Sequence, residues 1–270
     1  MSAAPPDKPA TIPILGVPIA QMTYDSVLAL FTAWMDDAAA PRGPRSVALA
    51  NVHVVTESAL RPAYARALRD VDVILPDGMP LVWASRALGG TLRERCYGPT
   101  LMTRALDQSQ TSGWTHYLYG ATRPTLDALE AAIRRAWPAA VLAGAREAPF
   151  GPFDDAVEHE NLAAINAAAP DIVWVGLGCP KQEEWVARYA AGLRSRIVVA
   201  SGAAFDFIAG IKPQAPGWMQ KRGLEWAFRL LAEPRRLWKR YLIRNPYFVM
   251  QFSLQLMRRR WTEPRKPRSA

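Results

Sequence analysis

The chain has 270 residues, of which half are hydrophobic, and a formal net charge of +9. This length and composition suit one large α/β domain, or one domain with an appendage, and exclude a disordered or low-complexity chain. The only cysteines, Cys96 and Cys179, and the three histidines match neither a disulfide framework nor a structural zinc site, which favours a reducing, cytoplasmic setting.

Targeting and membrane-spanning segments are not expected. The first residues lack the basic region and long apolar run of a secretory signal. No window holds the roughly 18 consecutive apolar residues that a transmembrane helix requires.

Positive charge is concentrated at the C-terminal end of the chain. Residues 1–211 contain 18 Lys/Arg and 21 Asp/Glu, whereas residues 212–270 contain 15 Lys/Arg and 3 Asp/Glu and are rich in aromatic residues. A disordered basic tail has few aromatics, so this segment is expected to fold against something acidic. We therefore expect a flexible N-terminal lead (1–12), an α/β core (13–211) and a basic, aromatic-rich appendage (212–270).

Strand and helix patterns alternate along the core. The expected strands are 46–51, 73–75, 115–120, 139–145, 172–176 and 196–200. The expected helices run from 52 to 68 with a break near Pro62, and then over 79–88, 124–137, 154–169 and 181–190. Such alternation, with helices of about 10 to 15 residues, predicts a mostly parallel sheet with helices on both faces.

Five loops follow these strands and carry polar or glycine residues. Because the carboxyl ends of parallel strands share one edge of a sheet, we expect the five loops to converge there. They contain Asn51 and His53, Asp77 and Gly78, Gly120 to Thr122, residues 176–182, and the small-residue loop 201–206 with Asp206.

The sequence Pro76-Asp77-Gly78 allows two interpretations. Proline, aspartate and glycine are ordinary turn residues. A carboxylate at the end of a buried strand, beside a helix start, also lies where open α/β sheets perform chemistry. Local sequence does not decide between a turn and a site.

The pair Gly176 and Gly178 resembles the start of a dinucleotide-binding fingerprint. Pro180 and Lys181 follow instead of a third glycine, so the pattern is weak support for NAD. Two interpretations stay open: a phosphate or nucleotide near backbone N–H groups at a helix start, and a tight turn packed under the helix.

Three further features are the Asp-x-Asp motif at 70–72, His53 and Asp206. Asp70-Val71-Asp72 matches the Asp-x-Asp pattern that holds a cation in many sugar-nucleotide enzymes, but it precedes its strand, so no metal site is expected there. His53 is expected to pack or hydrogen-bond rather than to act as a base. Asp206 is expected to contact a bound group.

The basic tail has three possible tasks. After Pro246, the apolar stretch 247–257 is bounded by Arg244 and by arginines 258–260. It is too short to span a bilayer but can lie in the interface beside anionic lipid. A helix docked on the core with a solvated basic face is the plainer alternative. Nucleic acid is the third, but no known nucleic-acid module accompanies the basic residues, and none is expected as a partner.

Four segments in the same order resemble the WecG/TagA/CpsF family of bacterial glycosyltransferases (glycosyltransferase family 26). They are "LPDGMPLVWASRALGG", "VGLGCPKQEEW", "SGAAFDFIAG" and "GLEWAFRLLAEPRRLWKRYL", and the resemblance runs from about Ile14 to Phe252. It implies a Rossmann-like α/β core with a helical C-terminal appendage. It also implies inverting transfer of a hexose from a UDP-sugar to a polyprenyl-diphosphate-linked saccharide, without metal or cofactor, at the cytoplasmic membrane face.

The resemblance also implies roles for individual residues. Asp77 matches the proposed general base, Gln182 and Asp206 match the nucleotide pocket, and basic residues of the appendage are expected to close over the diphosphate. The full candidate set adds Asn51, His53 and Gly78 to the sugar pocket, Gly120, Ala121, Gly176, Gly178, Pro180, Lys181 and Gly202 to the nucleotide site, and Arg229, Arg236, Lys239 and Arg240 to the diphosphate site. Leu49 stands where many members have threonine, so a threonine-based contact to substrate is not expected and the donor can differ.

The resemblance leaves the substrates open. The donor sugar is expected to be glucose or N-acetylmannosamine. The expected partners are the lipid-linked acceptor and an anionic membrane surface, and association with a second copy of the chain stays open. The location is then peripheral, on the inner face of the cell membrane. The alternatives are another nucleotide-binding enzyme on the same fold, such as an oxidoreductase, and a non-catalytic basic membrane adaptor.

Overall fold

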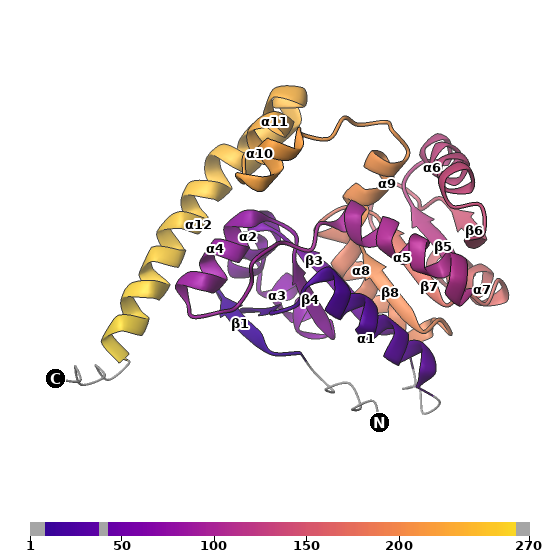
Figure 1. The fold of residues 1–270 in the computed structure, drawn as a ribbon, viewed down its shortest axis with the longest axis horizontal. Coiled ribbons are helices and arrows are strands. Elements are labelled where there is room, and N and C mark those ends of the chain that lie inside the picture. The colour runs from indigo at the N-terminus through magenta and orange to yellow at the C-terminus, as the bar shows by residue number, and fades with distance from the viewer. Residues whose placement is uncertain (1–8, 38–42, 263–270) are drawn as a thin grey trace.

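The computed structural model describes residues 9–37 and 43–262. Within them, one sheet has the strand order β1-β2-β4-β3-β8-β7-β5-β6 (Figure 1). Its strands are β1 (Thr11–Ile14), β2 (Val17–Ala20), β3 (Arg45–Ala50), β4 (Val73–Pro76), β5 (Thr115–Gly120), β6 (Val141–Arg146), β7 (Ile172–Gly176) and β8 (Ile197–Ala200).

All pairings in the sheet are parallel except that of β1 with β2. These two strands form a hairpin whose turn, Leu15 and Gly16, has positive φ at both residues. The central strands read as continuous apolar runs because both of their faces are buried. In β7, for example, Ile172, Val173 and Trp174 are all fully buried.

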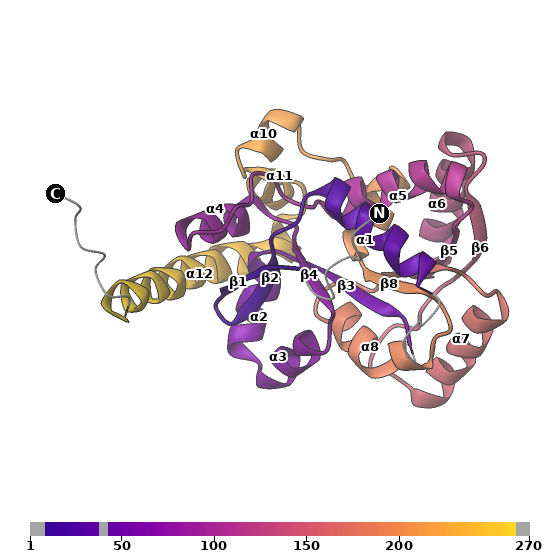
Figure 2. The ribbon, with the colours of Figure 1, turned by 60° about the horizontal axis from the view of Figure 1, so that its bottom comes forward.

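Helices cover both faces of the sheet, as predicted (Figure 2). One face packs against α1 (Tyr24–Asp36), α5 (Gly98–Ser112), α6 (Arg123–Ala136) and α9 (Gly202–Ile208). The other face packs against α2 (Val52–Leu60), α3 (Pro62–Arg69), α7 (Asp155–Ala167) and α8 (Lys181–Tyr189). Helix α4 (Met79–Ala87) contacts β1 and β4 at the edge of the sheet, and the short 3-10 helix η1 (Ala190–Gly192) follows α8.

The C-terminal appendage is helical, as predicted, and consists of α10 (Gly217–Lys221), α11 (Glu225–Ala232) and α12 (Pro234–Thr262). Figure 1 shows α12 as a long helix that runs away from α11 past α2 and α4. It packs against α2 and buries Leu237, Tyr241 and Phe248. No helix in the described part of the chain is both long and apolar enough to cross a membrane.

Local sequence signals explain where several helices begin. Thr23 caps α1 through a reciprocal capping box with Ser26, which satisfies two backbone N–H groups of the first turn. Asn51 caps α2, and its Oδ1 accepts hydrogen bonds from the backbone N–H groups of His53 and Val54. Thr122 stands at the N-cap of α6, with Pro124 in the first turn, where its missing N–H is not needed.

Two expectations need correction. The segment 201–206, expected as a loop, contains the first turns of α9, so Asp206 lies on a helix. Its small residues suggest a loop, but the helix is stabilised by burying Ala204 and Phe205 under the sheet edge. Strand β1 begins at Thr11, inside the segment expected as a lead, because it pairs with β2.

Candidate functional site

A cavity of about 520 Å³, here called the first cavity, opens at the carboxyl edge of the sheet. The ends of β3, β4, β5, β7 and β8 line it through Asn51, Asp77, Ala121, Gly176 and Ser201, in accord with the predicted convergence. Strands β3 and β8 are neighbours there, and the helices that follow them, α2 and α9, lie on opposite faces of the sheet. Ligands of open α/β sheets bind at such a switch point.

Asp77 follows β4 and is held by backbone and side-chain contacts. Its N–H donates to the Ala50 carbonyl at 2.7 Å, which continues the β3–β4 pairing by one residue. Its Oδ1 accepts a hydrogen bond of 3.0 Å from the Gly98 N–H, and its Oδ2 accepts one of 3.4 Å from Asn51 Nδ2. The carboxylate is therefore a positioned group at the site edge and not only a turn residue.

The surroundings of Asp77 raise the pKa of its carboxyl group. Burial is the largest cause, and the nearby carboxylate of Glu225 adds to it. Arg95 and the hydrogen bonds from Gly98 and Asn51 act in the opposite direction and do not compensate for burial. A carboxylate of this kind holds a proton more strongly than an exposed aspartate, which suits a general base.

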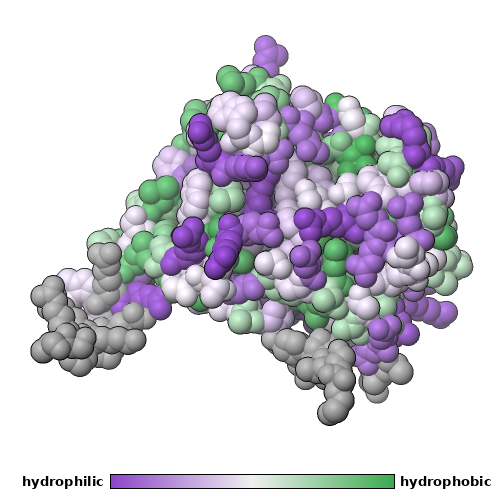
Figure 3. All heavy atoms as spheres, viewed as in Figure 1, coloured by the Kyte–Doolittle hydropathy of each residue, from purple (hydrophilic) through white to green (hydrophobic). Residues whose placement is uncertain are grey.

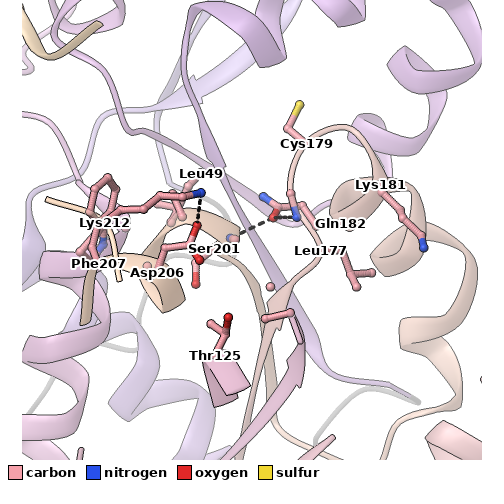
Figure 4. Close-up of a pocket in the computed structure, with 18 of the residues that line it drawn as sticks. Leu49, Thr125, Leu177, Cys179, Lys181, Gln182, Ser201, Asp206, Phe207 and Lys212 are labelled. Atoms are coloured by element: carbon pink, nitrogen blue, oxygen red, sulfur yellow. Dashed lines mark hydrogen bonds and ion pairs between the residues drawn. The ribbon is translucent and has the colours of Figure 1, made fainter. Parts of the chain in front are cut away.

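Gln182 joins two of the glycine-containing loops. Its Oε1 accepts hydrogen bonds from the Gly178 N–H at 3.1 Å and the Gly202 N–H at 2.9 Å (Figure 4). A Cβ at position 202 would lie 2.4 Å from that same oxygen, so only glycine fits. Gln182 Nε2 donates at 2.8 Å to the buried carboxyl of Glu183, whose pKa is raised by burial. These hydrogen bonds of Gln182 thus fix the positions of Gly178 and Gly202 in the wall of the cavity.

Charged residues of the appendage reach the other side of the first cavity. Lys212 Nζ lies 2.6 Å from Asp206 Oδ2 and 3.7 Å from Glu233 Oε1, and Glu233 also pairs with Arg236. Figure 4 shows the Asp206–Lys212 pair across the cavity from Gln182. The Arg229 guanidinium lies 5.7 Å from the centre of the Phe207 ring. Lys212, Arg229 and Arg236 therefore line the cavity, and Asp206 and Glu233 offset part of their positive charge.

Of the remaining residues predicted for the nucleotide and diphosphate sites, Lys181 lines the first cavity, whereas Gly120, Pro180 and Lys239 lie outside it. Lys181 Nζ donates to the Pro149 carbonyl at 3.0 Å. Gly120 instead packs against the Gly176 backbone, and Pro180 stands at the N-cap of α8. Lys239 is exposed outside both cavities and contacts Trp238, and the side chain of Arg240 lies outside the described part of the chain.

A second, smaller cavity of about 90 Å³ lies between the core and the appendage. It contains the predicted sugar-pocket residues His53 and Gly78, together with the aromatic residues Trp226 and Tyr241. The two cavities share only Asn51, Asp77 and Arg229. Asp77 therefore lies where they meet.

The Asp-x-Asp pattern has a structural role. Asp72 Oδ2 accepts hydrogen bonds of 2.8 Å from both the N–H and the hydroxyl of Ser46, at the amino end of β3. This position is at the opposite edge of the sheet from the cavities. Among residues 9–37 and 43–262, no group of three or more His, Cys, Asp and Glu side chains is arranged to hold a metal ion.

Sequence reasoning missed several residues of the site. Arg95, Tyr97 and Gly98 precede or begin α5 and follow no strand, so the strand-end rule does not find them. Glu225 is one of only three acidic residues in the appendage. This scarcity is the feature of the sequence that could have identified Glu225 as a residue of the site. Leu49, which departs from the family pattern, is buried in the wall of the first cavity.

Known proteins resemble this chain over most of its length. Residues 12–262 match the sequence profile described as glycosyl transferase WecG/TagA/CpsF family. An N-acetylglucosaminyldiphosphoundecaprenol N-acetyl-beta-D-mannosaminyltransferase of Bacillus spizizenii is 30% identical over 227 residues, which cover 83% of this chain and 86% of that protein. A protein of the same description from Staphylococcus aureus is 28% identical over 191 residues, covering 71% and 73%. The chain thus belongs to the WecG/TagA/CpsF family of glycosyl transferases.

Proposed function

We propose that the protein transfers a hexose from a UDP-sugar to a polyprenyl-diphosphate-linked saccharide, with inversion at the anomeric carbon. The position of Asp77 carries the proposal: a half-buried carboxylate of raised pKa stands where a large cavity under appendage cations meets a smaller cavity lined by aromatic residues. The large cavity suits the nucleotide sugar, and the smaller one suits the end of the acceptor.

The polar groups of the first cavity suggest how UDP lies in it. Arg229, Arg236 and Lys212 offer donors to a diphosphate, and arginine forms paired hydrogen bonds with phosphate oxygens. The glycine loops connected by Gln182 allow close approach of the nucleoside to the backbone. The hexose then extends toward Asp77.

In this arrangement Asp77 removes the proton from the acceptor hydroxyl. The hydroxyl oxygen forms a bond to the anomeric carbon while the bond from that carbon to the UDP oxygen breaks on the opposite face, which inverts the configuration. A positioned base contributes roughly 10²- to 10⁴-fold to such a reaction. Asn51 and the Gly98 N–H orient the carboxylate for this task.

The departing UDP carries growing negative charge on its diphosphate. Cations already in place stabilise that charge more effectively than solvent, because they need no reorganisation during the reaction. Lys212, Arg229 and Arg236 would supply this stabilisation, so we propose that transfer does not require a divalent metal.

The relatives favour one of the two expected donors. Both named relatives are N-acetylmannosaminyltransferases acting on N-acetylglucosaminyldiphosphoundecaprenol. We therefore place UDP-N-acetylmannosamine ahead of UDP-glucose, with the undecaprenyl-linked saccharide as acceptor in cell-envelope polysaccharide synthesis. Leu49 in the cavity wall is the residue through which the donor preference could differ.

The outer face of α12 supports association with the cytoplasmic membrane surface. Its exposed large apolar residues are Trp238, Leu242, Ile243, Val249, Met250, Leu254, Met257 and Trp261. Figure 3 shows hydrophobic residues along the slope formed by this helix. Arginines of the same helix can attract anionic lipid while the apolar side chains enter the interface. A peripheral position of this kind would bring the lipid-linked acceptor to the second cavity.

The proposal is tested by transfer from a panel of labelled UDP-sugars to a short-chain polyprenyl-diphosphate N-acetylglucosamine, with and without EDTA. Asp77→Asn should lower the rate by 10²-fold or more, while Asp127→Asn, an exposed change on α6, should not. Transfer from one donor, insensitive to EDTA, with the opposite anomeric configuration in the product, is the expected result. Retention of configuration, or full activity in Asp77→Asn, would overturn the mechanism. Absence of UDP binding would overturn the substrate class.

A further inference from the structure

Arg95, in the segment before α5, donates two hydrogen bonds to the appendage near Asp77. Its Nη1 donates to Glu225 Oε2 at 2.7 Å, and its Nη2 donates to Gln220 Oε1 at 2.8 Å. Both acceptors belong to the appendage, one on α10 and one on α11. The side chains of Arg95 and Glu225 are each only 13% exposed, so solvent screens this ion pair weakly.

The same guanidinium lies beside Asp77. Arg95 Nη1 is 3.4 Å from the Asp77 carbonyl oxygen, and the guanidinium carbon lies 4.2 Å from the centre of the Tyr97 ring. The positive charge of Arg95 favours the ionised form of Asp77, and the negative charge of Glu225 disfavours it. The two carboxylates therefore compete for one cation.

The appendage helices at this point are weakly held. No residue of α10 or α11 is buried, whereas α12 buries three large side chains, of which Phe248 belongs to the core. Segments with few buried contacts open at low free-energy cost. When α10 and α11 separate from the core, Arg95 loses Gln220 and Glu225 together, and its guanidinium stays beside Asp77.

We propose that Glu225 is a positioning residue for the transfer reaction. It holds Arg95 away from the Asp77 carboxylate, so that Asp77 can act as the base only when the appendage is docked on the core. The inference rests on the proposed role of Asp77 as the base. It gives the appendage a task at the acceptor side of the site, separate from binding the diphosphate. Hydroxyl deprotonation would then be restricted to the closed enzyme.

Other groups around Asp77 belong to the same electrostatic environment and must be kept constant in a test. The titratable and charged side chains that face it are His53 from α2, Arg95, Cys96 and Tyr97 from the segment before α5, and Glu225 and Arg229 from α11. Glu225→Gln changes only one of these charges. Glutamine still offers an oxygen to Arg95, so the contact can persist while the negative charge is lost.

The test is a carbon-13 NMR titration of carboxyl-labelled aspartate in the full chain, with the Asp77 signal assigned by its disappearance in Asp77→Asn. In Glu225→Gln, the Asp77 midpoint should move to lower pH, and Glu225→Asp should return it toward the wild-type value. Asp25→Asn, which removes an exposed ion pair with Arg104, is the matched control and should leave the midpoint unchanged. An unchanged midpoint in Glu225→Gln would overturn the inference.

Kinetics and binding provide the second measurement. Glu225→Gln should lower kcat by about tenfold, with UDP affinity within about twofold of the wild type. A loss of UDP affinity as large as the loss of kcat would instead mean that Glu225 only holds the appendage closed, which would also overturn the inference. The titration needs no substrate, so failure of the wild-type protein to transfer sugar would contradict the proposed function without deciding the Glu225–Arg95 relationship.

Discussion

Arg244 of α12 and Glu57 of α2 form an ion pair of 2.6 Å that connects the appendage to the core. The Glu57 side chain is only 7% exposed, and its other basic neighbours, His53 and Arg61, lie farther away at 3.8 Å. The pair thus fixes α12 against α2, the helix whose N-cap is Asn51. It is separate from the contacts of the appendage with Arg95.

Loss of Arg244 should destabilise the protein. Arg244→Met leaves the Glu57 carboxylate without its closest cation, and we expect a decrease of about 1–3 kcal/mol in the free energy of unfolding. Urea denaturation followed by circular dichroism measures it. Arg235→Met, an exposed change on the same helix, is the control. Equal midpoints for the two variants would show that the pair contributes nothing.

Asp77→Asn should stabilise the protein at neutral pH while abolishing transfer. Because the pKa of Asp77 is raised in the folded state, the folded state binds a proton more strongly than the unfolded state. Stability from this group is present at low pH and is lost as pH rises through the folded-state pKa. The gain in Tm for the asparagine variant should therefore be large at pH 7 and vanish below about pH 4. A gain that is independent of pH would contradict this assignment.

Arg229 and Arg236 should contribute to UDP binding far more than Lys239. The two arginines line the first cavity, whereas Lys239 is exposed outside it. We expect Arg229→Ala and Arg236→Ala each to weaken UDP binding by about 10-fold or more, since a charge-assisted hydrogen bond contributes roughly 1.5–3 kcal/mol. Lys239→Ala should change the Kd by less than about twofold. Isothermal titration with UDP measures all three, and an equal effect of Lys239→Ala would contradict the placement.

The outer face of α12 should determine membrane binding. Val249→Glu combined with Leu254→Glu places two carboxylates on that exposed face. Sedimentation with vesicles rich in phosphatidylglycerol should then show a large loss of bound protein, because burial of apolar side chains and attraction to anionic lipid are both reduced. Val141→Glu, on the exposed edge strand β6, is the control. Equal binding of both variants would exclude α12 as the membrane contact.

The sequence by itself determined the six parallel strands β3 to β8, many of the helices and the edge of the sheet at which the site lies. Runs such as Ile172–Gly176 are apolar throughout because both faces of a central parallel strand are buried, and this pattern is local. The loop residues Asn51, Asp77 and Gly176 follow such runs directly. Their convergence follows from parallel pairing alone, since all carboxyl ends then share one edge.

Local pattern was insufficient where tertiary contacts decide the structure. The hairpin of β1 and β2 is short and contains prolines, so its strands are recognised only through their pairing with each other and with β4. Helix α9 begins with small residues that resemble a loop, and it forms because Phe205 is buried. Burial against a distant element is not visible in a local window of sequence.

Only the tertiary structure decided which charges surround the base. Arg95 and Glu225 are 130 positions apart, and neither follows a strand, so nothing in their local sequence indicates that they meet beside Asp77. The raised pKa of Asp77 likewise depends on burial and on the sum of charges from several segments. Residue identity and periodicity predict where the backbone goes, whereas electrostatic coupling depends on distances between side chains, which exist only once the chain has folded.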